Sequence, residues 1–327
     1  MNGAGYRDFL QHRNISSATI DTAIAVVESF ETFLRSRDQN QTADAATADA
    51  AKSFSEQLIC EGGNSFDSYL ALLRYGVFSQ NRALYVAMLE LLDGAEAFGN
   101  LHAKIGNELG EAKRDEYFQN VQVPPLGTPN EKKPVLVQQV IDRLEKDDPG
   151  ACRQILGSGL RDLKDEWYQD AVTEFAACSG IDAYLAKRSE SFIAELEEHK
   201  RKGSWWFVQE ITEEVIAFVR QHPLMSGGVR EGRIVYEVKI PYMAKEWLQE
   251  SDPKMKRYYA CHCPWVRESL RTGDVHVSPT FCHCSAAFHK KPWEIIFGQP
   301  LQADVVESIL KGDSQCKFAI HLPESAL

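Results

Sequence analysis

The chain has 327 residues, 44% of them hydrophobic and 25% charged, a composition typical of a globular rather than a disordered protein. Its formal net charge of −11 argues against nucleic acid as the main partner, because nucleic-acid-binding surfaces are basic. No apolar run approaches the roughly 20 residues that a membrane-spanning helix needs. The first residues also lack the basic-then-apolar order of a signal peptide. We therefore expect a cytoplasmic protein with reduced thiols, no nucleic-acid partner and no membrane partner.

The first 110 or so residues have the pattern of successive helices. Ser16 is the expected N-cap of the helix that follows it, which carries apolar residues at helical spacing. Further helices are predicted over residues 42–60, which end at a pair of glycines, and over 66–79 and 82–92. We expect the apolar stripes of these helices to be packing faces. Residues 1–122 are therefore predicted to form a helical bundle.

Part of this bundle is similar to the helical core-binding domains of tyrosine recombinases. The similarity lies in residues 6–10 (YRDFL) and 14–20 (NISSATI). It implies a bundle of helices. The catalytic half of that family, with its arginines, histidine and tyrosine, is not recognisable downstream, so no DNA function is inferred.

The rest of the chain changes from helical to mixed character. Residues 123–134 are rich in proline and glycine and are predicted to be a linker. Helical periodicity returns over residues 135–222, which we expect to pack on the C-terminal domain. Alternation over residues 233–240 and 316–322 predicts strands. Residues 223–327 should therefore form an α+β domain with an antiparallel or mixed sheet, behind a helical N-terminal two-thirds.

The two predicted strands each have an apolar face. In the first strand Ile234, Tyr236 and Val238 take one face, and charged residues occupy most of the other. In the second strand Cys316 and Phe318 share a face. We expect these apolar faces to turn toward the core.

Two Cys-His-Cys triplets are the most informative feature of the chain. They are Cys261-His262-Cys263 and Cys282-His283-Cys284. In an extended segment, residues two apart point to the same side, so each triplet can present two sulfurs together. Two such pairs could bind Zn²⁺ tetrahedrally; one or both histidines could join, or the thiolates could hold an iron–sulfur cluster. Unliganded thiols packed in the core, and redox or nucleophilic thiols, stay open as alternatives.

The residues after each triplet suggest how reactive the thiols are. Pro264 suits the first position of a helix, which makes Cys263 the expected N-cap. Cys284 precedes a helix in a similar way. A thiol at a helix N-terminus has a lowered pKa, and Arg267 and Arg271 could strengthen the positive field.

The C-terminal residues resemble the 4-vinyl reductase domain, a small-molecule-binding module. The likeness lies in residues 297–300 (FGQP), 305–308 (VVES) and 312–318 (GDSQCKF). It implies an α+β fold with a ligand pocket. The whole chain also resembles a prokaryotic family that carries paired Cys-His-Cys motifs.

The same resemblance makes Cys316 a candidate metal ligand, because the family places a metal-binding cysteine just after a Gly-Asp turn. Its metal-binding members also have an acidic residue and a second cysteine, where this chain has Val305 and Ser308. Neither of these can serve as an equivalent ligand. We therefore expect the triplets to supply replacement ligands from across the pocket.

The leading hypothesis is a small-molecule-binding protein with a cysteine-rich site that binds zinc; an iron–sulfur cluster is the less favoured cofactor. The candidate metal ligands are Cys261, Cys263, Cys282, Cys284, Cys316, His262 and His283. The expected ligand pocket is lined by Trp265, Arg267, Phe281, Phe288 and Trp293.

Two other functions stay open. The first is a metal- or thiol-dependent enzyme, in which Glu268, Glu294 or His283 would act as acid or base. The second is a structural zinc site in an interaction protein. The sequence identifies neither a reaction nor an oligomeric state, and a homodimer is compatible with it.

Overall fold

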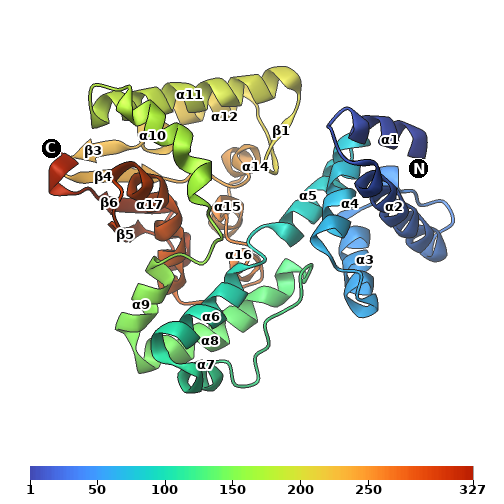
Figure 1. The fold of residues 1–327 in the computed structure, drawn as a ribbon, viewed down its shortest axis with the longest axis horizontal. Helices are drawn as coiled ribbons and strands as arrows, with labels where there is room; N and C mark the ends of the chain where they lie inside the picture. The colour runs from blue at the N-terminus through green and yellow to red at the C-terminus, as the bar shows by residue number, and fades with distance from the viewer. Residues whose placement is uncertain (327) are drawn as a thin grey trace. The chain divides into compact units, whose positions relative to one another are not determined.

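The fold is α+β, as predicted: a long helical part is followed by a four-stranded antiparallel sheet near the C-terminus. The computed structural model describes residues 1–326. The chain divides into two compact units (Figure 1). The first comprises residues 1–95 and 124–133, and the second comprises residues 96–123 and the chain from 134 onward. In the described residues no helix is long and apolar enough to cross a membrane.

The first unit is a helical bundle around an aromatic core. Ser16 caps its longest helix as predicted, since its side chain accepts a hydrogen bond from the Thr19 backbone N–H. The buried Tyr6 hydroxyl donates to the Ala71 carbonyl at 2.7 Å, so its polar group is satisfied inside the core. The helices are α1 (Gly3–Gln11), α2 (Ser17–Arg37), α3 (Ala48–Glu61), α4 (Phe66–Phe78) and α5 (Arg82–Leu92).

The predicted boundary between bundle and linker is placed differently in the structure. Most of the proline- and glycine-rich stretch 123–134 packs within the first unit, where Ser55 Oγ donates to the Gly127 carbonyl at 2.7 Å. Gly127 has φ +89°, and a Cβ atom there would lie 1.8 Å from the Tyr69 hydroxyl. Residues 96–123, predicted as part of the bundle, belong to the second unit. Local composition marks a break in helical structure, but tertiary contacts decide which unit the segment joins.

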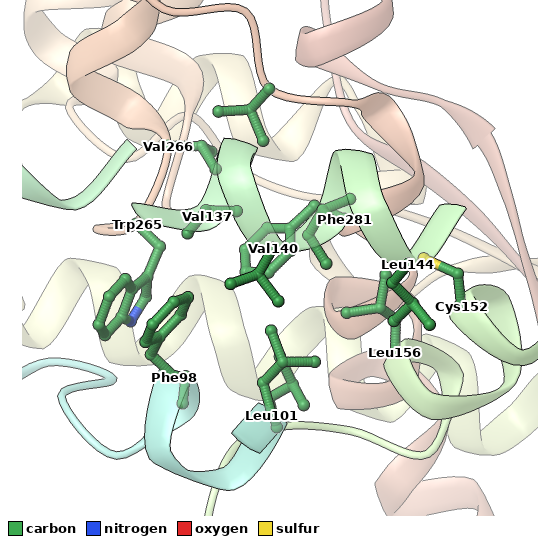
Figure 2. Packing of buried hydrophobic residues seen from close by; sticks show 14 of the residues in the cluster. Phe98, Leu101, Val137, Val140, Leu144, Cys152, Leu156, Trp265, Val266 and Phe281 are labelled. Carbon is green, nitrogen blue, oxygen red and sulfur yellow. The ribbon is translucent and has the colours of Figure 1, made fainter. Parts of the chain in front are cut away.

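The second unit begins with a helical core that also includes segments from near the C-terminus. Phe98 stacks on Trp265 with ring centroids 5.0 Å apart, and both are buried beside Val140 and Leu156 (Figure 2). Its helices are α6 (Ala97–Leu109), α7 (Glu111–Tyr117), α8 (Lys133–Asp147), α9 (Pro149–Gly157), α10 (Gln169–Ala176), α11 (Ile181–Lys202), α12 (Glu213–Arg220), α13 (Pro223–Ser226), α14 (Ala244–Gln249), α15 (Pro253–Ala260), α16 (Arg267–Thr272) and α17 (His283–Phe297). A short hairpin, β1 (Trp205–Trp206) and β2 (Gln209–Glu210), interrupts the stretch predicted as helical.

The four-stranded sheet of the second unit has the order β3-β4-β6-β5 with every pair antiparallel. Val235 lies opposite Ile320, and Glu237 lies opposite Phe318. Trp293 of α17 shares a core with Val235 and Ile320, so α17 covers this face of the sheet. The strands are β3 (Val229–Glu231), β4 (Ile234–Val238), β5 (Gln302–Glu307) and β6 (Lys317–His321).

The predicted apolar face of β4 is only partly right. Val238 is buried, but Ile234 and Tyr236 are half-buried, whereas Val235 and Glu237 on the opposite face are buried. The reason is that β4 is an inner strand, and α17 packs on the face that was predicted to carry charged residues. The apolar phase predicted for β6 is confirmed at Phe318, which is fully buried.

Candidate functional site

The first triplet follows α15 in extended backbone. Cys261 has φ −77° and ψ 122°, and its N–H donates to Arg257 in the last turn of the helix. Extended backbone places residues two apart on one side, and Cys261 and Cys263 are indeed close enough for Cys263 to raise the pKa of Cys261. The two thiols of the first triplet therefore lie in one neighbourhood.

His262 points to a different partner from its flanking cysteines. Its Nε2 lies 2.6 Å from the Ile240 carbonyl oxygen, and its ring packs edge-on against Tyr242. Because a carbonyl only accepts hydrogen bonds, Nε2 carries the proton and Nδ1 is the bare nitrogen. Burial, with Lys239 nearby, lowers the pKa of His262 to about 3, so the ring is neutral.

The second triplet has a different backbone, and the prediction that both its sulfurs face one way is wrong. Cys282 ends a 3₁₀ turn (Pro279–Cys282), and Cys284 lies in the first turn of α17. Helical residues two apart point about 200° away from each other. Cys282 faces Cys316 and Cys263, while Cys284 faces the Leu160 backbone, with which it hydrogen-bonds.

Four cysteines from three segments lie near enough to one another to influence each other's pKa, and we call them the thiol group. They are Cys261, Cys263, Cys282 and Cys316. Burial, and then the neighbouring thiols, raise the pKa of Cys261 well above its usual value and that of Cys282 to about 12. Burial also raises the pKa of Cys316. The thiols of these three residues are therefore protonated in the metal-free protein.

Ser308 hydrogen-bonds to a member of the thiol group. It is fully buried, and its Oγ donates to the Cys282 Sγ at 3.0 Å. Its backbone N–H donates to Asp313 Oδ2 at 2.7 Å, which fixes the turn between β5 and β6. Cys282 therefore lies beside the turn that joins β5 to β6.

Lys239 adds a positive charge next to the thiol group. Its backbone N–H donates to the Cys316 carbonyl at 3.1 Å, and its ammonium donates to Ser285 Oγ at 3.0 Å. The ammonium also lies 6.0 Å from the Phe288 ring centroid and 5.9 Å from that of Phe318. The sequence analysis missed this lysine, because it lies one residue beyond the end of β4 and far from both triplets in the chain.

Glu237 is a second group that the sequence analysis missed. This buried carboxylate accepts hydrogen bonds from Arg188 Nη1 at 2.8 Å, Trp293 Nε1 at 3.0 Å and His289 Nδ1 at 2.7 Å. Burial alone would raise its pKa, but Arg188 and His289 outweigh that effect and lower it to about 2. His289 stacks on Phe318 at 4.5 Å, and its bond to Glu237 leaves Nε2 as the bare nitrogen.

Two of the predicted acid–base residues interact with groups outside the thiol group. The pKa of His283 is lowered by burial and by Arg153, which is not part of the thiol group. Glu294 accepts hydrogen bonds from the Leu301 N–H and pairs with Lys290, both at 3.0 Å.

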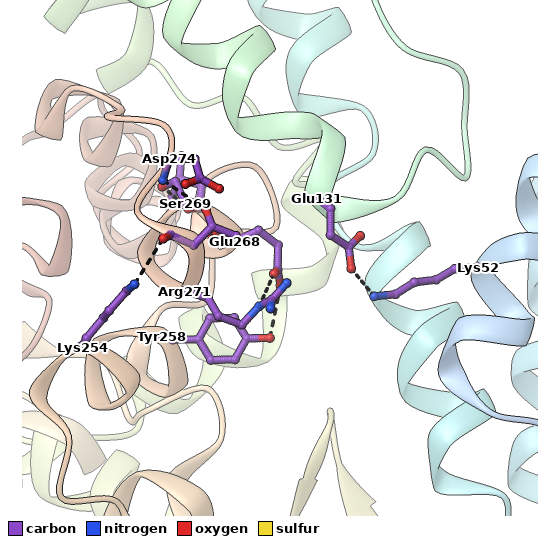
Figure 3. Close-up of polar contacts among 10 residues, drawn as sticks. Lys52, Glu131, Lys254, Tyr258, Glu268, Ser269, Arg271 and Asp274 are labelled. Carbon is purple, nitrogen blue, oxygen red and sulfur yellow. Dashed lines mark hydrogen bonds and ion pairs between the residues drawn. The ribbon is translucent and has the colours of Figure 1, made fainter.

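The third predicted acid–base residue, Glu268, is part of an aromatic and ionic cluster (Figure 3). It is buried, accepts from the Tyr258 hydroxyl at 3.1 Å and pairs with Arg271 at 2.7 Å. Arg267 lies between two rings, 4.6 Å from the centroid of Tyr242 and 5.0 Å from that of Tyr258. Arg267 is 3% exposed, so it is a packed residue rather than part of an open pocket wall.

The predicted aromatic pocket residues do not surround one cavity. Trp265 and Phe281 belong to the helical core (Figure 2). Trp293 belongs to the core between α17 and the sheet, and Phe288 is 41% exposed. Large aromatic side chains were predicted to line a ligand pocket, but three of the four are core residues.

The prediction that Cys263 caps a helix is also wrong. The helix expected to begin at Pro264 begins at Arg267, and Val266 is its N-cap, because a turn follows Cys263 first. The Cys263 carbonyl accepts from the Arg267 N–H at 3.0 Å. The pKa of Cys284 is raised by burial instead of being lowered by a helix dipole.

A small pocket adjoins the thiol group. It has a volume of 100 Å³, and Cys316 and Lys239 form part of its wall. Apolar side chains from α12 and α14, Phe218 and Trp247, form another part, with their ring centroids 5.2 Å apart. The pocket therefore combines apolar walls with a thiol and a lysine.

Within residues 1–326, the structure contains no group of three or more His, Cys, Asp and Glu side chains that could hold a metal ion. No protein-family model, curated protein sequence or solved structure matches the chain.

Proposed function

We propose that the protein binds a small molecule and a Zn²⁺ ion in its second unit, and that the thiol group is the metal site. The observation that supports the proposal is that thiols from three segments, which follow α15, precede α17 and precede β6, raise one another's pKa. Four thiolates are the ligand set of a structural tetrahedral zinc site. A reducing, cytoplasmic setting would keep these thiols free to bind.

The residues fit zinc chemically, but the ion must draw the sulfurs together. A cysteine sulfur moves by rotation about one side-chain bond between three staggered positions, so the ligands can adjust without moving the backbone. Buried neutral thiols would release their protons on binding. His262 Nδ1, the bare nitrogen, is a further donor in the same segment. Cys284 and His283 are omitted from the proposed ligand set, because they face other neighbours.

The adjoining pocket supports the small-molecule part of the proposal. Its volume of 100 Å³ suits a ligand of a few non-hydrogen atoms or one end of a larger molecule. Because Cys316 belongs to both the pocket wall and the thiol group, a ligand in the pocket would lie next to the metal site.

Metal analysis of the full chain, purified in reducing buffer without chelator, tests the proposal. We expect one zinc per chain, loss of that zinc in Cys261→Ala, and no change in Cys60→Ala, where the cysteine is exposed in the first unit. Visible absorption would reveal an iron–sulfur cluster instead. A wild-type chain that takes up no metal from added Zn²⁺ would refute the proposal. Unfolding when the zinc is removed would indicate a structural zinc site rather than a ligand-binding site.

A further inference from the structure

A larger pocket in the second unit has no part in the proposed function. Its volume is about 410 Å³, within the range of pockets that hold small molecules. One wall is the face of α6 that carries Asn100 and Lys104, and the other is formed by residues 158–164, which follow α9. It shares no wall residue with the pocket beside Cys316. It is therefore a separate candidate binding site.

The wall of this pocket is positively charged, although the chain as a whole has a formal net charge of −11. Its cations are Lys104, Arg161 and Lys164, and its carboxylate is that of Asp162. Arg161 pairs with Glu96, with 2.9 Å between Nε and Oε1. The two lysines pair with no carboxylate of residues 1–326. The pocket therefore favours a ligand that carries negative charge.

Lys104 keeps hydrogen-bond donors available for such a ligand. Its side chain is half-buried, and its ammonium donates to Ser158 Oγ at 2.9 Å. That hydroxyl is neutral and itself donates to the Ile155 carbonyl at 2.7 Å, so it positions the ammonium without compensating its charge. An ammonium has three N–H donors, and two of those on Lys104 are not used within residues 1–326.

The loop that carries Lys164 is fixed against α6 by Asn100. The Asn100 Nδ2 donates to the Leu160 carbonyl at 3.0 Å and to Asp162 Oδ1 at 2.7 Å. Gly159 has φ +85°, a left-handed conformation that favours glycine and allows the chain to turn after α9. Tertiary contacts thus bring both lysines to one pocket, and the Asp162 carboxylate bonds to an amide rather than to either lysine.

We infer that this pocket binds the phosphate group of a phosphorylated small molecule through Lys104 and Lys164. A phosphate ester carries close to two negative charges at neutral pH and has three acceptor oxygens, which suits two ammonium groups. Lysine ammonium groups lie on flexible stems, so both can reach one phosphate. The volume of the pocket leaves room for the rest of a small molecule. A nucleic acid is disfavoured, because a chain with a net charge of −11 repels a polyanion.

An NMR titration of the nitrogen-15-labelled full chain with inorganic phosphate, at constant ionic strength, tests the inference. We expect saturable shifts in the backbone signals of residues 100–104 and 158–164. Lys104→Met should weaken phosphate binding by about tenfold or more, because it removes a hydrogen bond to a charged group. Lys164→Met should weaken it by roughly threefold, since this lysine is exposed. Acetate, with a single charge, should bind more weakly than phosphate.

Lys146→Met is the matched control. Lys146 is exposed in the last turn of α8 and is not part of the pocket wall, so its removal makes the same change in net charge and should leave phosphate binding unchanged. Circular dichroism checks that the variants fold. Equal weakening in Lys104→Met and Lys146→Met, no saturable shifts in the wild type, or equal binding of acetate and phosphate would overturn the inference.

A second titration distinguishes the small molecule from a nucleic acid. Glucose 6-phosphate serves as the phosphorylated small molecule, and a short single-stranded oligonucleotide is compared with it at the same concentration of phosphate groups. We expect the sugar phosphate to bind more tightly. Tighter binding of the oligonucleotide would overturn the assignment to a small molecule. Neither titration involves the thiol group, so their results are independent of whether the chain binds zinc.

Discussion

The two Cys-His-Cys triplets have the same sequence but different backbones, and the difference decides what each can do. The first follows a helix in extended conformation, and Cys263 raises the pKa of Cys261. The second straddles a 3₁₀ turn and the start of α17, so that Cys282 and Cys284 point apart. The contribution of a repeated motif therefore depends on local periodicity as much as on residue type.

The difference also explains how Cys316 enters the thiol group. Because the second triplet delivers one sulfur rather than two, the fourth thiol comes from the residue before β6. Cys282 lies near Cys316 and next to Ser308. Its sulfur accepts a hydrogen bond from the Ser308 hydroxyl. The thiol group therefore has four members, although the two triplets do not contribute equally to it.

The largest expected effect separates the two cysteines of the second triplet. Cys282→Ala should weaken zinc binding by about a thousandfold, because it removes one of four proposed ligands. Cys284→Ala should leave the affinity unchanged, since Cys284 faces Leu160. Competition titrations of the two variants measure this. Equal losses in both would show that the triplets act as equivalent pairs and would contradict the comparison.

The next effect concerns the register of α17, which turns Cys282 rather than Cys284 toward the thiol group. Glu237 holds this register through His289 and Trp293, one turn apart on α17. Glu237→Gln should lower the free energy of unfolding by about 4 kcal/mol, because Arg188 is left without its buried counter-charge. Urea denaturation measures the loss. Asp304→Asn, at a half-exposed pair with His321, serves as the control and should cost less than about 1 kcal/mol.

Acidification should gradually weaken the contacts of the Glu237 carboxylate. The folded state lowers the pKa of Glu237 from 4.5 to about 2, so the carboxylate stabilises the fold above pH 4.5. That stabilisation, about 3 kcal/mol at most, is lost as the pH falls from 4.5 toward 2. Urea denaturation at a series of pH values should show a smaller dependence in Glu237→Gln. Parallel curves for the variant and the wild type would contradict this assignment.

The smallest expected effect separates the two histidines. His262→Ala should lower the free energy of unfolding by about 1.5 kcal/mol, since it removes a hydrogen bond to the Ile240 carbonyl inside the protein. His283→Ala should cost less, because its ring is less enclosed and makes no comparable bond to the core. Thermal denaturation of the metal-free variants compares them. A larger loss of stability for His283→Ala than for His262→Ala would contradict the assignment of His262 as the more enclosed histidine.

Much of the fold could be predicted from the sequence. Ser16 as a helix cap and the apolar phase of Phe318 follow from short-range chemistry and alternation, and both are confirmed. Unit membership could not be predicted in the same way, because hydrogen bonds such as that from Ser55 to Gly127 join residues far apart in the chain. Composition identified the break but not its partners.

The candidate site was predicted less completely. The cysteines stood out because they are rare and clustered, but the side that each faces depends on whether the backbone is extended or helical. Glu237 was placed on the charged face of its strand, since alternation cannot show which face of an inner strand a helix covers. Lys239 gave no local signal at all. Its significance comes from a sheet register that brings it next to Cys316.

Zinc-dependent protection of individual cysteines tests the central claim most directly. The full chain would be alkylated with and without bound Zn²⁺, and each of the eight cysteines followed by peptide mass mapping. The account predicts that zinc slows alkylation of Cys261, Cys263, Cys282 and Cys316 and leaves the rate at Cys284 unchanged. Protection of Cys284 equal to that of Cys282, or no protection of any cysteine by zinc, would contradict it.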